Sequence, residues 1–204
     1  MAPQIGSHQT KSLPEGILRT RDLTALGLTR TQVRRLASRG NLVALSRGLY
    51  CKPDTPMDAR HSLAEVSKRV PRGIICLTSA LQFHNLTTQN PWQACLMLPP
   101  GYHAPRIDSP AIWTFRASGE ALTAGVEEHI IEGVAVRVTS VARTVADCFK
   151  YRSRIGVDVA LEALKECLRD RRASVADLYR YARVCRVERV VRPYIEGMLE
   201  ALSA

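Results

Sequence analysis

The chain has 204 residues, 46% of them hydrophobic and 24% charged, which is enough for packed cores in one large or two small domains. Lysine and arginine number 29 against 19 aspartate and glutamate residues, so the formal net charge is +10. This composition excludes a disordered chain and indicates an anionic partner, such as nucleic acid or a membrane surface. A basic surface can also serve solubility alone.

The cysteines and the apolar segments indicate where the protein is located in the cell. The six cysteines lie far apart, without a Cys-x-x-Cys pair: Cys51, Cys76, Cys95, Cys148, Cys167 and Cys185. This spacing does not fit a zinc site, and reduced thiols are expected. No segment approaches the roughly 18 uninterrupted apolar residues of a membrane span, and residues 1–12 lack the apolar centre of a signal peptide. We therefore expect a cytoplasmic protein without a membrane partner.

The first patterned region runs from Ile17 to Lys52 and predicts helix, turn, helix and hairpin in that order. Residues 1–12 before it are polar and are expected to be disordered. After it, the stretch Pro53-Asp54-Thr55-Pro56 interrupts the pattern and predicts a linker. We therefore expect a DNA-binding domain at residues 1–56 and a second domain at residues 57–204.

The second domain is predicted to mix helices and strands. Residues 57–70 and the residues from Ser140 onward have helical apolar spacing, and residues 73–77 predict a short buried strand. Four further runs are strand-like: residues 93–98, 111–116, 126–131 and 134–139. Glu132-Gly133 joins the last two as a hairpin. The expected fold class is α+β, a winged helix-turn-helix followed by a small, mostly antiparallel sheet with several helices.

The N-terminal pattern has the signals of a helix-turn-helix. Thr20 is expected to cap a helix over residues 21–26, and Gly27 supplies the turn. Thr29 is expected to cap a second helix that ends at Gly40. One face of that helix carries Val33, Leu36 and Ala37 and should pack on the first helix, while the opposite face carries no acid.

This second helix is the predicted recognition helix. A solvated helix normally mixes both signs of charge, so a face of Arg, Thr and Gln without a carboxylate indicates phosphates and base edges. Because recognition helices place their N-terminal residues against bases, readout is expected from the first half and phosphate contacts from the second. The candidate DNA-binding residues are Thr29, Arg30, Thr31, Gln32, Arg34, Arg35, Arg39 and, from the wing, Arg47.

The wing is predicted where residues 42–45 and 49–51 pair across Ser46-Arg47-Gly48, which puts Arg47 at the tip. Between Arg19 and Lys52 there are eight basic residues and one acid, Asp22, so +7 of the total charge of +10 belongs to this module. An ordinary helical hairpin with a solvated basic face is the alternative interpretation.

Several stretches of this module resemble a known family. The segments Gly16–Leu23, Leu26–Arg30, Val33–Leu36 and Leu45–Tyr50, with the Arg-Gly-Leu-Tyr turn, are similar to the N-terminal domain of AbiEi antitoxins of type IV abortive-infection systems. The stretches Thr78–Leu81 and Thr139–Asp147 resemble the C-terminal domain of the same family.

The resemblance implies a bipartite protein that represses its own promoter at inverted repeats in double-stranded DNA and counteracts a nucleotidyltransferase-like toxin. The alternative is a stand-alone winged-helix regulator whose second domain oligomerises or senses a ligand. Within the second stretch, Arg143 and Asp147 stand at i,i+4 spacing and predict a structural ion pair, with partner binding as the other reading.

An enzyme is the least favoured class. The five histidines follow no metal-ligand spacing, no Gly-x-Ser-x-Gly elbow or phosphate loop occurs, and no acid precedes a lysine by two positions as nucleases require. We expect no catalytic residues, no metal and no cofactor. An RNA-binding protein or a metal-dependent enzyme acting on nucleic acid is the third hypothesis.

Overall fold

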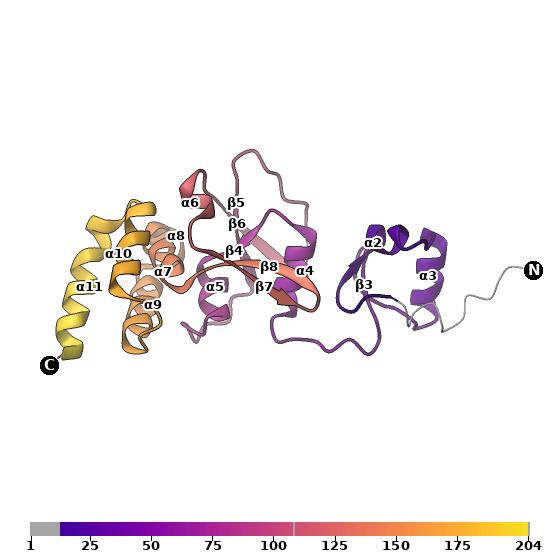
Figure 1. The fold of residues 1–204 in the computed structure, drawn as a ribbon, viewed down its shortest axis with the longest axis horizontal. Coiled ribbons are helices and arrows are strands. Elements are labelled where there is room, and N and C mark those ends of the chain that lie inside the picture. The colour runs from indigo at the N-terminus through magenta and orange to yellow at the C-terminus, as the bar shows by residue number, and fades with distance from the viewer. Residues whose placement is uncertain (1–12, 108, 204) are drawn as a thin grey trace, which may run out of the picture. The chain divides into compact units, whose positions relative to one another are not determined.

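The computed structural model describes residues 13–107 and 109–203 and divides the chain into two units (Figure 1). The first unit holds the described residues up to Arg69 together with Ile130–Ala135, and the second holds Val70–His129 and the described residues from Val136 onward. The sequence predicts two domains that fold and function separately, with a boundary between residues 56 and 57. This boundary stays a prediction. The disorder expected at residues 1–12 lies outside the described residues.

The first unit has the helices and strands of a winged helix-turn-helix. Its elements are β1 (Leu18–Arg19), α2 (Thr20–Ala25), α3 (Arg30–Ser38), β2 (Val43–Ser46), β3 (Leu49–Cys51) and α4 (His61–Arg69). The three strands form an antiparallel sheet in the order β1-β3-β2. Leu23 of α2 and Val33 and Leu36 of α3 are buried in one apolar cluster, which fixes α3 against α2.

The second unit contains the remaining elements. They are β4 (Ile74–Ile75), α5 (Leu77–Phe83), β5 (Gln93–Leu98), β6 (Ala111–Arg116), α6 (Glu120–Thr123), β7 (Val126–Ile131), β8 (Val134–Thr139), α7 (Val141–Lys150), α8 (Arg152–Ile155), α9 (Val157–Arg169), α10 (Val175–Val184) and α11 (Glu188–Ser203). The turn between β7 and β8, with the residues beside it, is counted with the first unit. The α+β class is confirmed.

The larger sheet differs from the prediction in its strand directions. Its order is β6-β5-β4-β8-β7, and β4 pairs antiparallel with β5 but parallel with β8, while β5 and β6 are also parallel. A mostly antiparallel sheet is therefore wrong, and the sheet is mixed. The reason lies in the connections: residues 99–110 lead β6 back to start beside the start of β5, and β8 returns to the centre of the sheet beside β4.

The four predicted strands themselves are confirmed with the predicted bounds as β5, β6, β7 and β8. Glu132 and Gly133 between β7 and β8 have φ angles of +48° and +70°. Two consecutive positive φ angles are typical of the two-residue turns that match strand twist. Among the described residues, no helix has both the length and the apolar character needed to cross a membrane.

Candidate nucleic-acid interface

Helix α3 begins with a reciprocal capping box. The Thr29 hydroxyl accepts a hydrogen bond from the Gln32 main-chain N–H at 3.2 Å, and Oε1 of Gln32 accepts one from the Thr29 N–H at 2.7 Å. Gly40, with a φ of +73°, follows the end of the helix in the left-handed conformation that glycine tolerates. The sequence signals for the start and end of this helix are confirmed.

The outward face of α3 is basic. The residues Thr29, Arg30, Thr31, Arg34 and Arg39 are exposed, and Gln32 and Arg35 are half-buried. Because Oε1 of Gln32 already accepts the hydrogen bond of the capping box, its amide NH₂ is the freer group to meet a base edge. This face therefore offers hydrogen-bond donors and positive charge but few acceptors.

The wing is formed by β2 and β3, whose register pairs Val43 with Cys51 and Ser46 with Leu49 and contains a bulge between Ala44 and Ser46. Arg47 and Gly48 make the turn, and Gly48 has a φ of +78°. Arg47 is exposed. A bulge increases the local twist of a hairpin, so the tip is displaced from the plane of the short sheet.

Thr20 has another role than the predicted cap. The residue that caps α2 is Arg19, whose main-chain N–H donates to Oδ2 of Asp22 at 3.0 Å. The main-chain N–H of Thr20 instead donates to the carbonyl of Gly48 at 2.9 Å, and its hydroxyl lies 3.4 Å from the same oxygen. Thr20 thus ties the wing turn to the first helix of the motif, and sequence reasoning missed this contact because it joins residues 28 positions apart.

The positive charge of the interface is not neutralised within the described part of the chain. Among the residues that the structure describes, no carboxylate forms an ion pair with any of the five candidate arginines: Arg30, Arg34, Arg35, Arg39 and Arg47. The one acid of the module, Asp22, is engaged by Lys68 at 2.9 Å and lies 3.8 Å from Arg21. Arginines without a partner keep their full attraction for phosphate.

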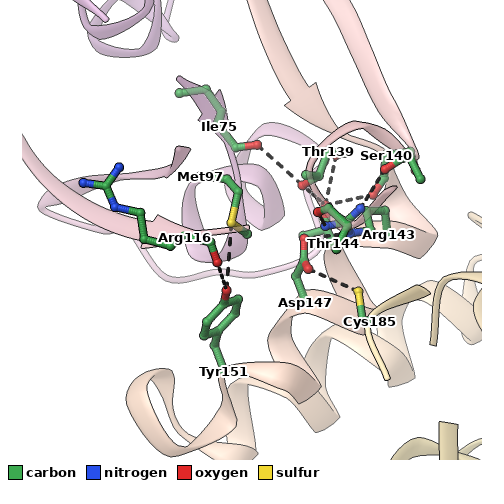
Figure 2. Close-up of polar contacts among 12 residues, drawn as sticks. Ile75, Met97, Arg116, Thr139, Ser140, Arg143, Thr144, Asp147, Tyr151 and Cys185 are labelled. Atoms are coloured by element: carbon green, nitrogen blue, oxygen red, sulfur yellow. Dashed lines mark hydrogen bonds and ion pairs between the residues drawn. The ribbon is translucent and has the colours of Figure 1, made fainter. Parts of the chain in front are cut away.

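The second family-like motif, Thr139–Asp147, builds a buried network instead of a surface (Figure 2). Nε of Arg143 lies 3.0 Å from Oδ2 of Asp147, and the two side chains are 1% and 0% exposed. Arg143 also donates to main-chain carbonyls at Ala121 and Ala124, which fastens α6 to α7. The Cys185 thiol donates to Oδ1 of Asp147 at 3.3 Å. The predicted structural ion pair is confirmed.

The hydroxyls of this motif are also internal. Oγ1 of Thr144 lies 2.8 Å from Oγ1 of Thr139 and 2.8 Å from the carbonyl of Ser140, which joins the end of β8 to the start of α7 (Figure 2). Ser140 precedes α7, but its own hydroxyl makes no capping hydrogen bond. The hydrogen bonds of Thr139 and Thr144 therefore hold the end of the sheet and the start of α7 together.

The cysteines do not form a reactive site. All six thiols are free and buried. Burial raises the pKa of Cys76 and Cys148 well above the ordinary thiol value and raises that of Cys185 to about 12. A thiol with a raised pKa is a poor nucleophile at neutral pH.

Comparison with known proteins gives matches of different reach. Residues 15–53 match the family model described as a transcriptional regulator, AbiEi antitoxin, which confirms the resemblance over the winged region. The fold is similar to the crystal structure of the RV2827C protein from Mycobacterium tuberculosis, with a TM-score of 0.59 and 17% identity over 86% of this chain and 68% of that one. No curated protein matches the sequence.

Proposed function

We propose that the chain is a transcriptional regulator that binds double-stranded DNA through α3 and the β2–β3 wing. The observation that carries this proposal is the exposed, acid-free face of α3, whose arginines have no carboxylate partner among the described residues. This face lies within the residues that match the regulator family. Such a protein acts where the DNA is, in the cytoplasm.

The eight candidate residues are assigned roles by their place on α3 or on the wing. Arg30, Thr31, Gln32 and Arg34, in the first half of α3, are assigned to base edges in the major groove. Arg35 and Arg39, nearer its C-terminal end, are assigned to phosphates, and Arg47 to the backbone or the minor groove. Thr29 contributes through the cap that sets the direction of the first turn.

The direct test compares two duplexes of equal length and composition. One carries the region upstream of the protein's own gene, and the other is its scrambled sequence. A sequence-specific regulator binds the first at least about a thousandfold more tightly at physiological salt. Equal affinity for both duplexes would leave only non-specific charge attraction and would contradict the assignment of Arg30 and Arg34 to base readout.

We further propose that the chain is an antitoxin of a type IV system, because residues 15–53 match a family described as regulator and antitoxin. It then represses its own promoter at inverted repeats, where two copies sit on one operator, and residues 57–204 counteract a nucleotidyltransferase-like toxin. The alternative is a stand-alone regulator whose second unit oligomerises or senses a ligand.

A separation-of-function variant distinguishes these two. The full chain carrying Arg34→Ala and Arg47→Ala is co-expressed with the neighbouring gene, and growth is scored. An antitoxin that acts through its second unit still rescues growth although repression is lost. No rescue by either the wild-type or the variant chain would favour the stand-alone regulator.

A further inference from the structure

Helix α4 contacts the base of the wing through a charged pair, the buried Glu65 and the half-buried Arg69. Glu65 is 7% exposed, and its Oε1 contacts the hydroxyl of Ser46, the last residue of β2. Nη2 of Arg69 lies 3.1 Å from Oε1 of Glu65 and contacts the same hydroxyl. Ser46 directly precedes Arg47 in the chain. The two charged groups therefore hold the residue next to the wing arginine.

The same helix also contacts the first helix of the motif. Nζ of Lys68 lies 2.9 Å from Oδ2 of Asp22, with the two side chains 19% and 31% exposed. Asp22 is the residue whose carboxylate accepts the main-chain N–H of Arg19 at the start of α2. Helix α4 therefore contacts both elements that flank the recognition helix, α2 and the wing.

A third set of contacts fixes α4 itself. Oε2 of Glu132 lies 2.7 Å from Nδ1 of His61, and Oε1 accepts the main-chain N–H of Asp58 at 2.8 Å. The carbonyl of Glu132 accepts the N–H of Ile17 at 3.1 Å. A Cβ added to Gly16 would lie 1.8 Å from that carbonyl oxygen, so the two chain segments are in close contact. The turn between β7 and β8 thus braces the start of α4.

These contacts add to the others that hold this short hairpin, the pairing of β3 with β1 and the hydrogen bond from Thr20 to Gly48. The wing strands β2 and β3 have four and three residues, and a hairpin of this size is only marginally stable in water. In a flexible wing, Arg47 loses conformational entropy when it binds DNA, and this loss weakens binding. In a wing that is already fixed in the folded protein, that entropy has been lost on folding. Charge-assisted hydrogen bonds are the stronger kind and give a defined geometry.

We infer that Glu65 and Arg69 are positioning residues for DNA binding, which hold Ser46 so that Arg47 meets the DNA backbone. Glu132 secures the same arrangement through His61. The inference rests on the proposed function, because it assigns Glu65 and Arg69 to the positioning of one DNA-contacting arginine. In this arrangement neither Glu65 nor Arg69 touches DNA itself.

A double-mutant cycle tests the inference on the full-length protein, with the operator duplex at fixed salt. Glu65→Gln keeps the shape of the side chain and removes its charge. We expect it to weaken binding about tenfold, the lower end of what one charged hydrogen bond contributes, and Arg47→Ala to do the same. If Glu65 acts through Arg47, adding Glu65→Gln to Arg47→Ala weakens binding by no more than about twofold.

The control cycle pairs the same change with the recognition helix. Arg34 is not held by Glu65, so if Arg34→Ala alone weakens binding about tenfold, as the loss of one charged hydrogen bond does, the two losses should multiply to about a hundredfold. A general loss of folding would lower affinity in both cycles alike, and near-UV circular dichroism of Glu65→Gln checks for it. Ser62→Ala, at an exposed position of α4, should bind as the wild type does.

A second variant keeps the inference testable if Glu65→Gln disturbs the fold. Ser46→Ala removes the hydroxyl that both charged groups contact and leaves their ion pair in place, so it should show the same non-additivity with Arg47→Ala. Wild-type affinity in both Glu65→Gln and Ser46→Ala, or full multiplication with Arg47→Ala, would overturn the inference while DNA binding stands. Absence of specific binding by the wild-type chain would overturn the proposed function as well.

Discussion

Replacing Asp147 by asparagine should destabilise the second unit by about 3–5 kcal/mol, the loss measured when one member of a buried ion pair is removed. The Arg143 guanidinium, 1% exposed, then remains inside the protein without its carboxylate. An arginine does not lose its proton to relieve this burial. For a chain of this length, the change corresponds to a decrease of about 10 °C in Tm.

Replacing the other member of the pair, Arg143→Met, should destabilise the protein less than Asp147→Asn does, and this destabilisation should depend on pH. Burial raises the pKa of the Asp147 carboxyl, and Arg143 opposes that shift. Without the guanidinium, the carboxyl can take up a proton and become neutral. A carboxyl with a higher pKa in the folded than in the unfolded protein penalises folding increasingly as pH rises between the two values. The destabilisation by Arg143→Met should therefore be smaller at pH 5 than at pH 8.

Urea denaturation followed by near-UV circular dichroism at these two pH values measures both effects. The matched control is Asp170→Asn, the same chemical change in an exposed carboxylate that pairs with Arg169 on the surface, and its midpoint should stay at the wild-type value. If the urea midpoint of Asp147→Asn also stayed at the wild-type value, the buried pair would not be what fastens α6 and α10 to α7.

Two further predictions concern a close backbone contact and a buried histidine. Gly16→Ala should destabilise the protein more than Gly27→Ala, since both glycines have φ near +90° but only a Cβ at Gly16 would meet the Glu132 carbonyl; equal losses in urea denaturation would contradict this. Burial lowers the pKa of His84, whose Nε2 lies 2.7 Å from the Thr139 carbonyl. Stability from the neutral ring is therefore present above the unfolded pKa of about 6.5 and lost as pH falls below it. His84→Gln should flatten the fall in urea midpoint between pH 7 and pH 5, and an unchanged slope would exclude His84 as its cause.

Local signals in the sequence predicted local structure well. Thr29 predicted the capped start of α3, and Gly40 its end, because caps and glycine turns depend on residues a few positions apart. The strand-like runs in the sequence predicted the bounds of the four longer strands. Strand direction did not follow from it, since periodicity does not reveal which strands become neighbours, and β4 beside β8 joins segments about 60 residues apart.

In the candidate interface, too, local features could be predicted from the sequence, whereas contacts between distant residues could not. The basic face of α3 and the wing turn could be predicted, because they follow from spacing on one helix and one hairpin. Thr20 carries an ordinary capping side chain, and nothing near it in the sequence shows that its partner is Gly48. The link from Glu132 to His61 spans 71 positions and has no local signal. The spacing of Arg143 and Asp147 predicted their ion pair but not its burial.

The most direct test of the central claim is the salt dependence of operator binding, measured by fluorescence anisotropy. Arg34→Ala with Arg47→Ala should weaken binding, because a base contact and a backbone contact are lost, and the loss of Arg47 should reduce the slope of log K against log salt concentration by about one. The control is Lys165→Ala with Arg189→Ala, which removes two exposed positive charges outside α3 and the wing. We expect the control pair to keep a near-wild-type slope and affinity. Equal losses in both double variants, or wild-type binding by the first, would contradict the assignment of DNA binding to α3 and its wing.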